Sequence, residues 1–357
     1  MEKTENRFLY LVKYIACMMV ILGHTRFPEP LGVYADTLCK AAVPFFFAVS
    51  GRFFLHDSSA DTKEIRDRAG RNLKKIGLIT LKVYLVYLVF SCFYHIRGGI
   101  SFSEWFSSKF NPGEAKVFFL FNSGKFIYDG SYVYDHMWYL FALIYVYILI
   151  LIFAPVFKKI VKPLTVLLFM GLYFANLLQN YYPIRPFDIS IKTWYVVRNW
   201  LLIGIPFVLL GVIFADYIEG LKSKLSKEEY EEKTSKWRVP FSVLIVFGIF
   251  LGLLEVHIFG EKQCLVGSLL ITVAILFLSE TRLSGGRFFW KIGKKYSGII
   301  YYYHVLVIAI LDMMTNKGII PPISGYLRPP VMMVIMTVIF GIIPLSKDMI
   351  YEKRRVS

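Results

Sequence analysis

Residues 8–27 read FLYLVKYIACMMVILGHTRF, an almost entirely apolar run close to the N-terminus. A helix needs about 20 such residues to cross the hydrocarbon layer of a bilayer. The run is long for the apolar core of a signal peptide, and no small-residue cleavage pattern follows it. We therefore expect residues 8–27 to stay in the protein as its first membrane-spanning helix.

Comparable runs recur to the end of the chain, which is 56% hydrophobic and only 18% charged. Soluble domains of ordinary composition carry about 25% charged residues. The pattern predicts an all-α, polytopic membrane protein that forms a single integral membrane domain over residues 1–357. The ten predicted transmembrane helices cover about 8–27, 35–55, 73–96, 136–158, 162–179, 198–218, 239–257, 264–280, 296–315 and 329–350.

The basic residues test this map, because cytoplasmic loops of membrane proteins are enriched in Lys and Arg. With both termini placed in the cytoplasm, the inner segments hold about 27 Lys and Arg and the outer segments about 11. The net charge of +16 therefore reflects membrane topology, and we expect membrane lipids and no nucleic acid among the partners. A multi-pass protein of the plasma or inner membrane is predicted.

Two loops exceed a simple turn. The inner 219–238 stretch is highly charged, and we expect it to be partly helical and peripheral. The outer 97–135 stretch is aromatic-rich, and its apolar piece 117–121 is too short to span a bilayer. A re-entrant or surface-lying segment is predicted there. The four cysteines show no paired spacing, which indicates neither a disulfide framework nor a metal site.

The first predicted helix contains two ionisable residues, Lys13 and His24. Ionisable groups inside a membrane are costly and are candidates for function. Eleven residues separate the two, which places them on one helix face with a rise of about 16 Å between them. In the predicted topology Lys13 lies toward the cytoplasm and His24 toward the outside. A snorkelling lysine and an interfacial histidine are the alternative interpretation.

A second group of candidates lies at the inner membrane edge. Residues 44–52 read PFFFAVSGR, where Ser50 and Gly51 permit close helix packing. Further along, Arg68, Arg71 and Lys75 recur at three- and four-residue spacing and share a helix face. That face is suited either to lipid headgroups or to the phosphates of a nucleotide-bearing cofactor.

Taken in order, these features resemble the membrane-bound acyltransferase 3 family. Lys13 and His24 match its signature of arginine or lysine, ten residues, and histidine, with lysine where arginine is common. The FFFAVSG run and the basic run after it resemble two further motifs. Residues 136–140 (HMWYL) resemble its tryptophan motif. Gly293, Ser297, Tyr301 and His304 are similar to its C-terminal motif.

The resemblance implies transfer of an acyl group from cytoplasmic acyl-CoA, acetyl-CoA by default, to a hydroxyl of a cell-surface or lipid-linked saccharide. His24 would be the catalytic base or a transient acyl carrier, since imidazole titrates near neutral pH. The expected cofactor-binding residues are Lys13, Arg68, Arg71 and Lys75. The expected substrate-binding residues are Trp138, Tyr139, Ser297, Tyr301 and His304. No metal is expected.

Two questions stay open at this point. The family also resembles the membrane halves of serine racemases linked to glycopeptide resistance, so a transporter of a small solute such as L-serine, or a glycan flippase, is the alternative function. Asp312 follows His304 by eight residues and could share its helix face. It could orient that histidine, although an interhelical polar contact is the favoured reading.

Overall fold

A computed structural model describes residues 5–54, 60–131, 135–181, 194–284, 286 and 288–356. Helices account for the regular structure in these ranges, and no strand occurs among them. Within the described ranges, eight helical segments are long and apolar enough to cross a membrane, some of them made of consecutive helices. Two shorter apolar helices cover Trp138–Phe153 and Val266–Leu278. The all-α polytopic fold is therefore confirmed. These segments follow the ten predicted ones in order, while the count of ten spans and the cytoplasmic termini stay predictions.

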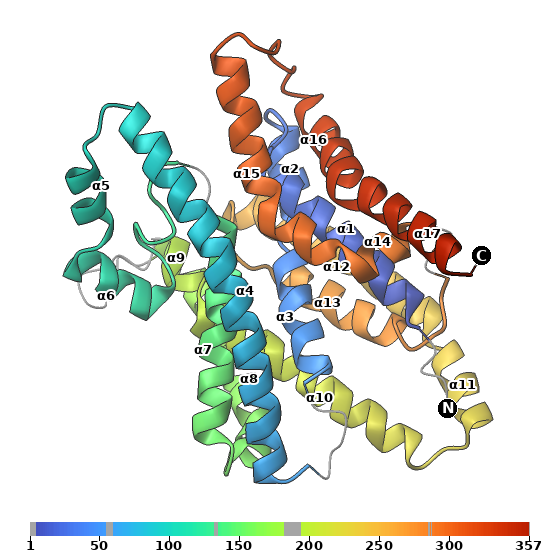
Figure 1. Cartoon of the computed structure of the whole chain (residues 1–357). Coiled ribbons are helices and arrows are strands. Elements are labelled where there is room, and N and C mark those ends of the chain that lie inside the picture. Colours follow the sequence, from blue (N-terminus) through green and yellow to red (C-terminus); the bar gives the residue numbers. More distant parts are fainter. Residues whose placement is uncertain are drawn as a thin grey trace. The chain divides into compact units, whose positions relative to one another are not determined.

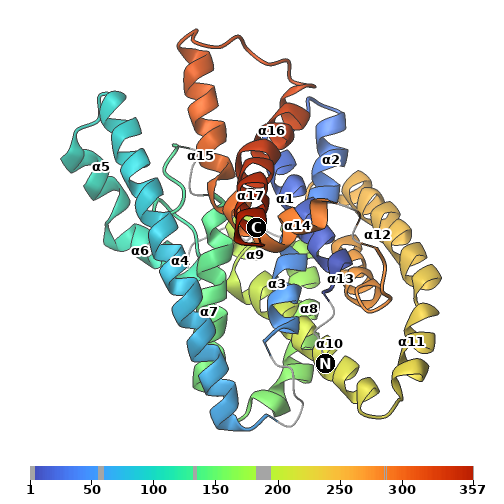
Figure 2. The same ribbon diagram turned by 45° about the vertical axis from the view of Figure 1, so that its right-hand side comes forward.

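Figures 1 and 2 show the helices of the described ranges. In chain order they are α1 (Arg7–His24), α2 (Leu31–Cys39), α3 (Ala42–Arg52), α4 (Thr62–Arg97), α5 (Phe102–Lys109), α6 (Pro112–Phe121), α7 (Trp138–Phe153), α8 (Phe157–Tyr181), α9 (Trp194–Val197), α10 (Ile205–Lys222), α11 (Lys227–Ser235), α12 (Arg238–Phe259), α13 (Val266–Leu278), α14 (Phe289–Lys295), α15 (Ser297–Asn316), α16 (Arg328–Thr337) and α17 (Ile343–Val356). A 3-10 turn covers Asp135–Met137, and π-helical turns cover Trp200–Gly204 and Val338–Ile342.

The chain divides into two compact units. The α1 unit comprises Met1–Phe46, Glu228–Glu261 and Gly267–Ser357, and in it α1 contacts α2, α14, α15 and α16. The α4 unit comprises Phe47–Lys227 and Lys262–Val266, and in it α4 packs against α7 and α5 while α8 packs against α10. Helix α3 belongs to both units, since the boundary falls after Phe46.

The second predicted span, 35–55, corresponds to one apolar segment, Leu31–Arg52, which a turn divides into two helices. Helix α2 ends at Cys39 and α3 begins at Ala42, with a turn at Lys40 between them. Pro44 supplies the reason, because it has no N–H to donate to the carbonyl of Lys40 and its ring crowds that carbonyl. The predicted end at residue 55 lies outside the described residues.

Helix α4 begins at Thr62, well before the predicted start at residue 73. Asp61 caps it, because the carboxylate accepts a hydrogen bond from the Glu64 N–H at 2.7 Å. The basic run therefore lies on the same helix that continues into the apolar stretch. The charged 219–238 stretch also contains helix α11, so its predicted partial helicity is confirmed.

Glycines set the closest helix crossings within each unit. A Cβ added at Gly51 would lie 1.8 Å from the Val208 carbonyl oxygen, and one added at Gly211 would lie 1.9 Å from that of Ala48. Helices α3 and α10 thus meet backbone to backbone, which confirms the packing role predicted for Gly51. In the α1 unit, a Cβ at Gly293 would lie 1.8 Å from the Tyr10 carbonyl oxygen.

A Gly293→Ala variant is expected to destabilise the α1 unit by about 1–3 kcal/mol, because α14 must move away from α1 to admit a methyl group. Gly77→Ala is the matched control, since a Cβ there meets nothing within 4 Å. In a helix that substitution is expected to be neutral or stabilising. Thermal unfolding midpoints in detergent distinguish the two, and equal midpoints would contradict the close approach seen at Gly293.

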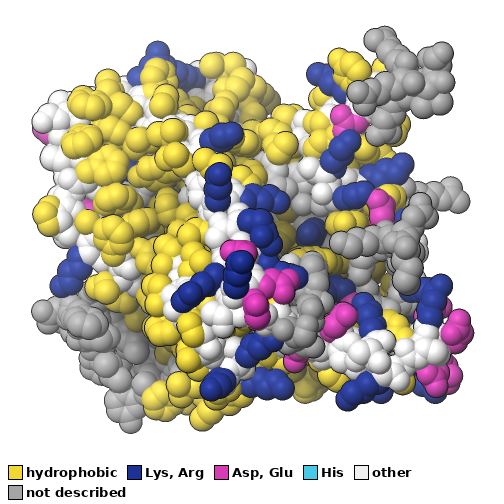
Figure 3. Space-filling model, turned by 60° about the horizontal axis from the view of Figure 1, so that its bottom comes forward, with side chains coloured by type: hydrophobic (Ala, Val, Ile, Leu, Met, Phe, Trp, Pro, Cys, Tyr) yellow, Lys and Arg dark blue, Asp and Glu magenta, His cyan; other side chains and the backbone are white. Residues whose placement is uncertain are grey.

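The outer surface is rich in large apolar side chains. Exposed examples include Val89 on α4 and Val239 on α12, at 71% and 72% relative exposure. Figure 3 shows a broad apolar surface beside a region with many Lys and Arg side chains. Exposed apolar surface of this extent fits helices that face lipid acyl chains.

Candidate functional site

Helix α1 presents both ionisable residues that the sequence singled out. The helix is continuous from Arg7 to His24, so Lys13 and His24 lie on one face about 16 Å apart, as predicted. Lys13 lies over the Tyr10 ring, with its Nζ atom 5.6 Å from the ring centroid. His24 is the last residue of the helix and is partly exposed.

A second histidine lies beside His24. The ring centroids of His24 and His304 are 5.1 Å apart, with 54° between the ring planes. His304 comes from α15 and is fully buried. The Tyr301 ring lies 5.9 Å from the His304 ring, and the Phe46 ring lies 5.8 Å from that of Tyr301. The structure thus brings together three predicted site residues, His24, Tyr301 and His304.

The backbone of α15 fixes the orientation of His304. Its Nδ1 lies 2.8 Å from the Tyr301 carbonyl oxygen. A carbonyl can only accept a hydrogen bond, so Nδ1 carries the proton and donates it. In the neutral ring Nε2 is then the basic nitrogen.

A polar contact also joins α1 to α15 closer to Lys13 than the His24–His304 pair is. The Cys17 thiol donates to the Ser297 carbonyl oxygen at 3.3 Å. The Ser297 hydroxyl donates to the Gly293 carbonyl oxygen at 2.7 Å. With its proton engaged in this way, Ser297 offers only acceptor capacity to a substrate.

An ion-pair cluster holds the end of α1 that carries His24. The guanidinium of Arg26 lies 2.8 Å from the Glu29 carboxylate, 3.6 Å from that of Asp36 and 2.5 Å from that of Glu261. The side chain of Arg26 is 38% exposed, so each of these pairs is individually weak. Together they join the ends of α1, α2 and α12. Sequence inspection missed this cluster, because its members are dispersed along the chain and no helical spacing connects them to Glu261.

Asp312 does not orient His304. Its two carboxylate oxygens accept from Nη2 of Arg328, at 2.9 and 2.7 Å. The contact joins α15 to α16, so the interhelical polar contact favoured from the sequence is confirmed.

In the α4 unit, two of the sequence motifs meet. The Phe47 ring packs on Trp138 and Tyr139 of α7, with centroid distances of 5.7 and 4.6 Å. The hydroxyls of Ser50 and Tyr139 lie 3.4 Å apart. The guanidinium of Arg198, which the sequence reading had missed, stacks on Trp138 at 5.3 Å from the ring centroid. Trp138 and Tyr139 are both buried.

Three of the four predicted phosphate ligands lie in the N-terminal part of α4. Arg71 and Lys75 are exposed, and Arg68 is half-buried. Arg68 pairs with Glu64 at 2.5 Å and donates to the Phe54 carbonyl oxygen at 3.4 Å. The sequence reading did not identify Glu64 as a partner, although its spacing of four residues is that of a helical ion pair. Arg71 and Lys75 therefore present the cationic charge of this face.

No group of three or more His, Cys, Asp or Glu side chains in the described ranges is arranged to hold a metal ion. The site residues instead fall into two sets. Lys13, His24, Ser297, Tyr301 and His304 belong to the α1 unit, and Arg68, Arg71, Lys75, Trp138 and Tyr139 belong to the α4 unit.

Comparison with known families settles the class of protein. The sequence model of the acyltransferase 3 family, described as an acyltransferase domain, matches residues 6–345. The chain belongs to this family. The resemblance read from the motifs is thereby confirmed, and the protein is a membrane acyltransferase. No match was found among curated proteins or among solved structures.

For an acyltransferase, the α1 unit supplies two titratable rings and one amine on adjoining helices. Imidazole can take a proton from a hydroxyl nucleophile at neutral pH. The amine of Lys13, three helical turns away on the same face, can attract an anionic group.

Proposed function

We propose that this acyltransferase moves an acyl group, acetyl by default, from cytoplasmic acyl-CoA to a hydroxyl of a cell-surface or lipid-linked saccharide. The protein would act in the plasma or inner membrane as one domain. The observation that carries the proposal is the His24–His304 pair, with ring centroids 5.1 Å apart on α1 and α15. Paired histidines inside a membrane protein are expensive and are most readily explained by chemistry.

His24 is the proposed general base. It accepts the proton of the saccharide hydroxyl while that oxygen attacks the thioester carbonyl carbon. The new carbon–oxygen bond forms, the carbon–sulfur bond breaks, and the proton passes from the imidazolium to the departing CoA thiolate. His304 acts through His24 as a positioning residue, because its buried ring is fixed by the Tyr301 carbonyl.

The remaining predicted residues have roles consistent with their chemistry. Lys13, Arg68, Arg71 and Lys75 would bind the phosphates of CoA. Trp138, Tyr139 and Tyr301 would contact the acceptor, where aromatic rings suit the apolar faces of sugars. Ser297 would accept a hydrogen bond from the substrate.

The proposal is tested with purified protein in detergent and in vesicles. We expect release of CoA from acetyl-CoA, stimulated by a hydroxyl acceptor. In vesicles loaded with buffer we expect no uptake of L-serine. Serine uptake with neither binding nor turnover of acetyl-CoA would overturn the proposal and favour transport.

An Arg71→Ala/Lys75→Ala variant is expected to raise KM for acetyl-CoA by roughly tenfold or more with kcat little changed, since charge-assisted contacts to a bound phosphate are lost. Arg66→Ala is the matched control, because this exposed arginine lies on the opposite face of the same helix. An equal rise in KM for the control would show that only the overall charge matters.

A further inference from the structure

The depth of α4 in the membrane follows from its composition. Residues 62–75 carry most of its charge, whereas residues 76–96 are mostly apolar, and Lys82 and His95 are their only ionisable basic residues. That apolar stretch has the length needed to cross the hydrocarbon layer. The C-terminal end of α4 at Arg97 therefore marks one edge of the membrane.

Helix α5 folds back along this end of α4. The Trp105 indole N–H donates to the Ser91 hydroxyl at 3.0 Å. Ser91 lies six residues before Arg97, which is about 9 Å further into the membrane along the helix axis. Figures 1 and 2 both show α5 beside the last turns of α4. The Trp105 indole therefore lies at the level of Ser91, inside the edge of the hydrocarbon layer.

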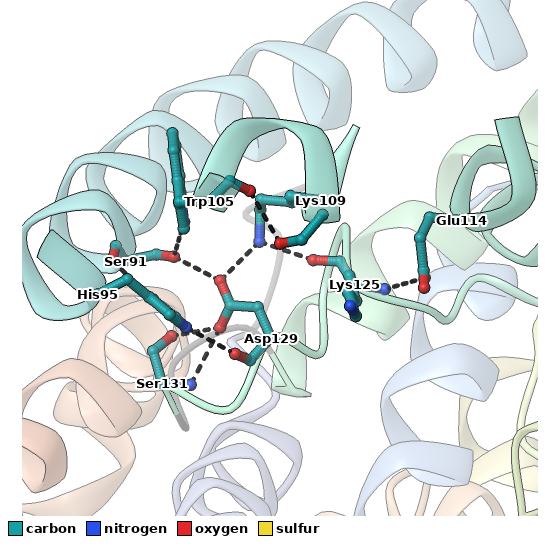
Figure 4. Close-up of polar contacts among 9 residues, drawn as sticks. Ser91, His95, Trp105, Lys109, Glu114, Lys125, Asp129 and Ser131 are labelled. Atoms are coloured by element: carbon teal, nitrogen blue, oxygen red, sulfur yellow. Dashed lines mark hydrogen bonds and ion pairs between the residues drawn. The ribbon is translucent and has the colours of Figure 1, made fainter. Parts of the chain in front are cut away.

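A buried ion pair fixes this arrangement (Figure 4). The ammonium of Lys109 lies 2.7 Å from the Asp129 carboxylate, with the two side chains 1% and 6% exposed. The Lys109 ammonium also donates to the Lys125 carbonyl oxygen at 2.7 Å. The hydroxyl of Ser91 donates to the same carboxylate. Charges at membrane depth are tolerated when they are paired and enclosed by protein in this way.

Backbone polar groups in the non-helical segment around Asp129 also have hydrogen-bonding partners. The His95 ring spans two carbonyl oxygens, those of Ser91 and Asp129, each at 2.9 Å (Figure 4). The Ser131 N–H donates to Asp129 at 3.1 Å. Backbone outside helices occurs at membrane depth only where protein or water satisfies it.

The outward side of this segment is apolar. On α5, Phe102 and Phe106 are 57% and 49% exposed, and on α6 Phe119 is 63% exposed. On α4 itself the exposed apolar side chains include Val89, Phe93 and Ile96, and the last of these adjoins the helix end at Arg97. The rest of the exposed surface of α5 carries polar residues such as Glu104 and Ser107.

Glu104 gives that polar face a charge. The Ser101 hydroxyl and backbone N–H both donate to its carboxylate, at 2.7 and 3.0 Å, and these bonds lower the pKa of Glu104. An amphipathic helix with one apolar edge and one charged face is suited to the boundary between acyl chains and headgroups.

We propose that residues 98–131 form a membrane-embedded hairpin whose Phe102, Phe106 and Phe119 side chains bind the acyl chains of lipid at the membrane edge where α4 ends. The occupant is the lipid layer itself, because the Trp105–Ser91 bond places α5 against the apolar stretch of α4. On α6, the ring of Phe118 next to Phe119 packs on Phe141 of the apolar helix α7, with ring centroids 4.9 Å apart. The hairpin also encloses the Lys109–Asp129 pair and so separates it from lipid.

Spin labels measure this directly. Cysteine is introduced at Phe106 or Phe119 in a Cys39→Ala/Cys92→Ala background and labelled with a nitroxide in phosphatidylcholine vesicles. Accessibility to oxygen, relative to a water-soluble nickel complex, is expected to be within about twofold of Val89→Cys. It is expected to exceed that of Ser235→Cys, on the charged helix α11, by about fivefold or more.

Ser107→Cys is the control on the same helix, and its ratio is expected to be lower than that of Phe106→Cys. Ratios at Phe106 and Phe119 nearer to that of Ser235→Cys would overturn the proposal. Equal ratios at positions 106 and 107 would overturn it too, since immersion of one edge of α5 requires them to differ.

Discussion

A His24→Ala variant is expected to lower kcat for acyl transfer by about a thousandfold, because a positioned general base contributes roughly 10²–10⁴ in rate. The Kd for acetyl-CoA is expected to stay within about twofold of wild type, since the proposed phosphate ligands are untouched. Release of CoA measured under saturating donor reports kcat, and equilibrium binding of acetyl-CoA reports Kd. A lower kcat together with an unchanged Kd would assign His24 to the chemical step rather than to binding of acetyl-CoA.

His257→Ala is the matched control, because this exposed histidine at the end of α12 belongs to the same unit. It is expected to leave kcat unchanged. Unchanged turnover in His24→Ala would contradict the role of His24 as base. Loss of acetyl-CoA binding together with turnover would indicate structural damage instead.

His304 provides a second variant of the same experiment. His304→Gln is expected to lower kcat less than His24→Ala. If His304 acts through His24, the double variant is expected to be no slower than His24→Ala alone, since effects of residues that act as a unit do not add. Additive losses would contradict a positioning role.

The membrane helices could be predicted because their signal is local. Each depends on a run of about 20 apolar residues, and the same run sets the length of α1 in the structure. The errors were also local. The start of α4 was misplaced because Asp61 caps a charged first turn that hydropathy does not detect. The turn between α2 and α3 follows from Pro44, which cannot donate a hydrogen bond to the carbonyl of Lys40. A hydropathy average does not detect this effect.

The partners of the site residues could not be predicted in the same way. Helical periodicity places Lys13 and His24 on one face, but it does not say which helix that face contacts. His304 comes from a distant helix, and only packing brings its ring to His24. Asp129 lies in a loop without periodicity, so nothing in the sequence indicated its burial against Lys109.

An Asp129→Asn variant is expected to destabilise the 98–131 segment by about 3 kcal/mol or more, because it leaves the ammonium of Lys109 buried without its counter-charge. Burial raises the pKa of Asp129, but the charge of Lys109 and the hydrogen bonds to the carboxylate outweigh it and hold the pKa below its usual range. The carboxylate is therefore ionised at pH 7. Its stabilisation is complete above about pH 4 and is lost as the pH falls through the lowered pKa.

Amide hydrogen exchange of α5 in detergent at pH 7 measures this loss locally. A decrease of 3 kcal/mol in the free energy of opening corresponds to an exchange rate about a hundredfold faster. Glu232→Gln is the matched control. It breaks an ion pair with Lys236 of similar length, 2.8 Å, in which both side chains are about 70% exposed, so no change is expected.

A Lys109→Met/Asp129→Asn double variant separates the buried charge from the fold of the hairpin. It removes the ammonium together with its partner. The single asparagine oxygen can still accept from Ser131, and the NH2 group that replaces the other carboxylate oxygen can donate to the Ser91 hydroxyl. We expect exchange in α5 to return most of the way to the wild-type rate, since replacing both members of a buried pair costs far less than removing one. Exchange as fast as in Asp129→Asn alone would show that the segment is held by the carboxylate's hydrogen bonds rather than by compensation of the Lys109 charge.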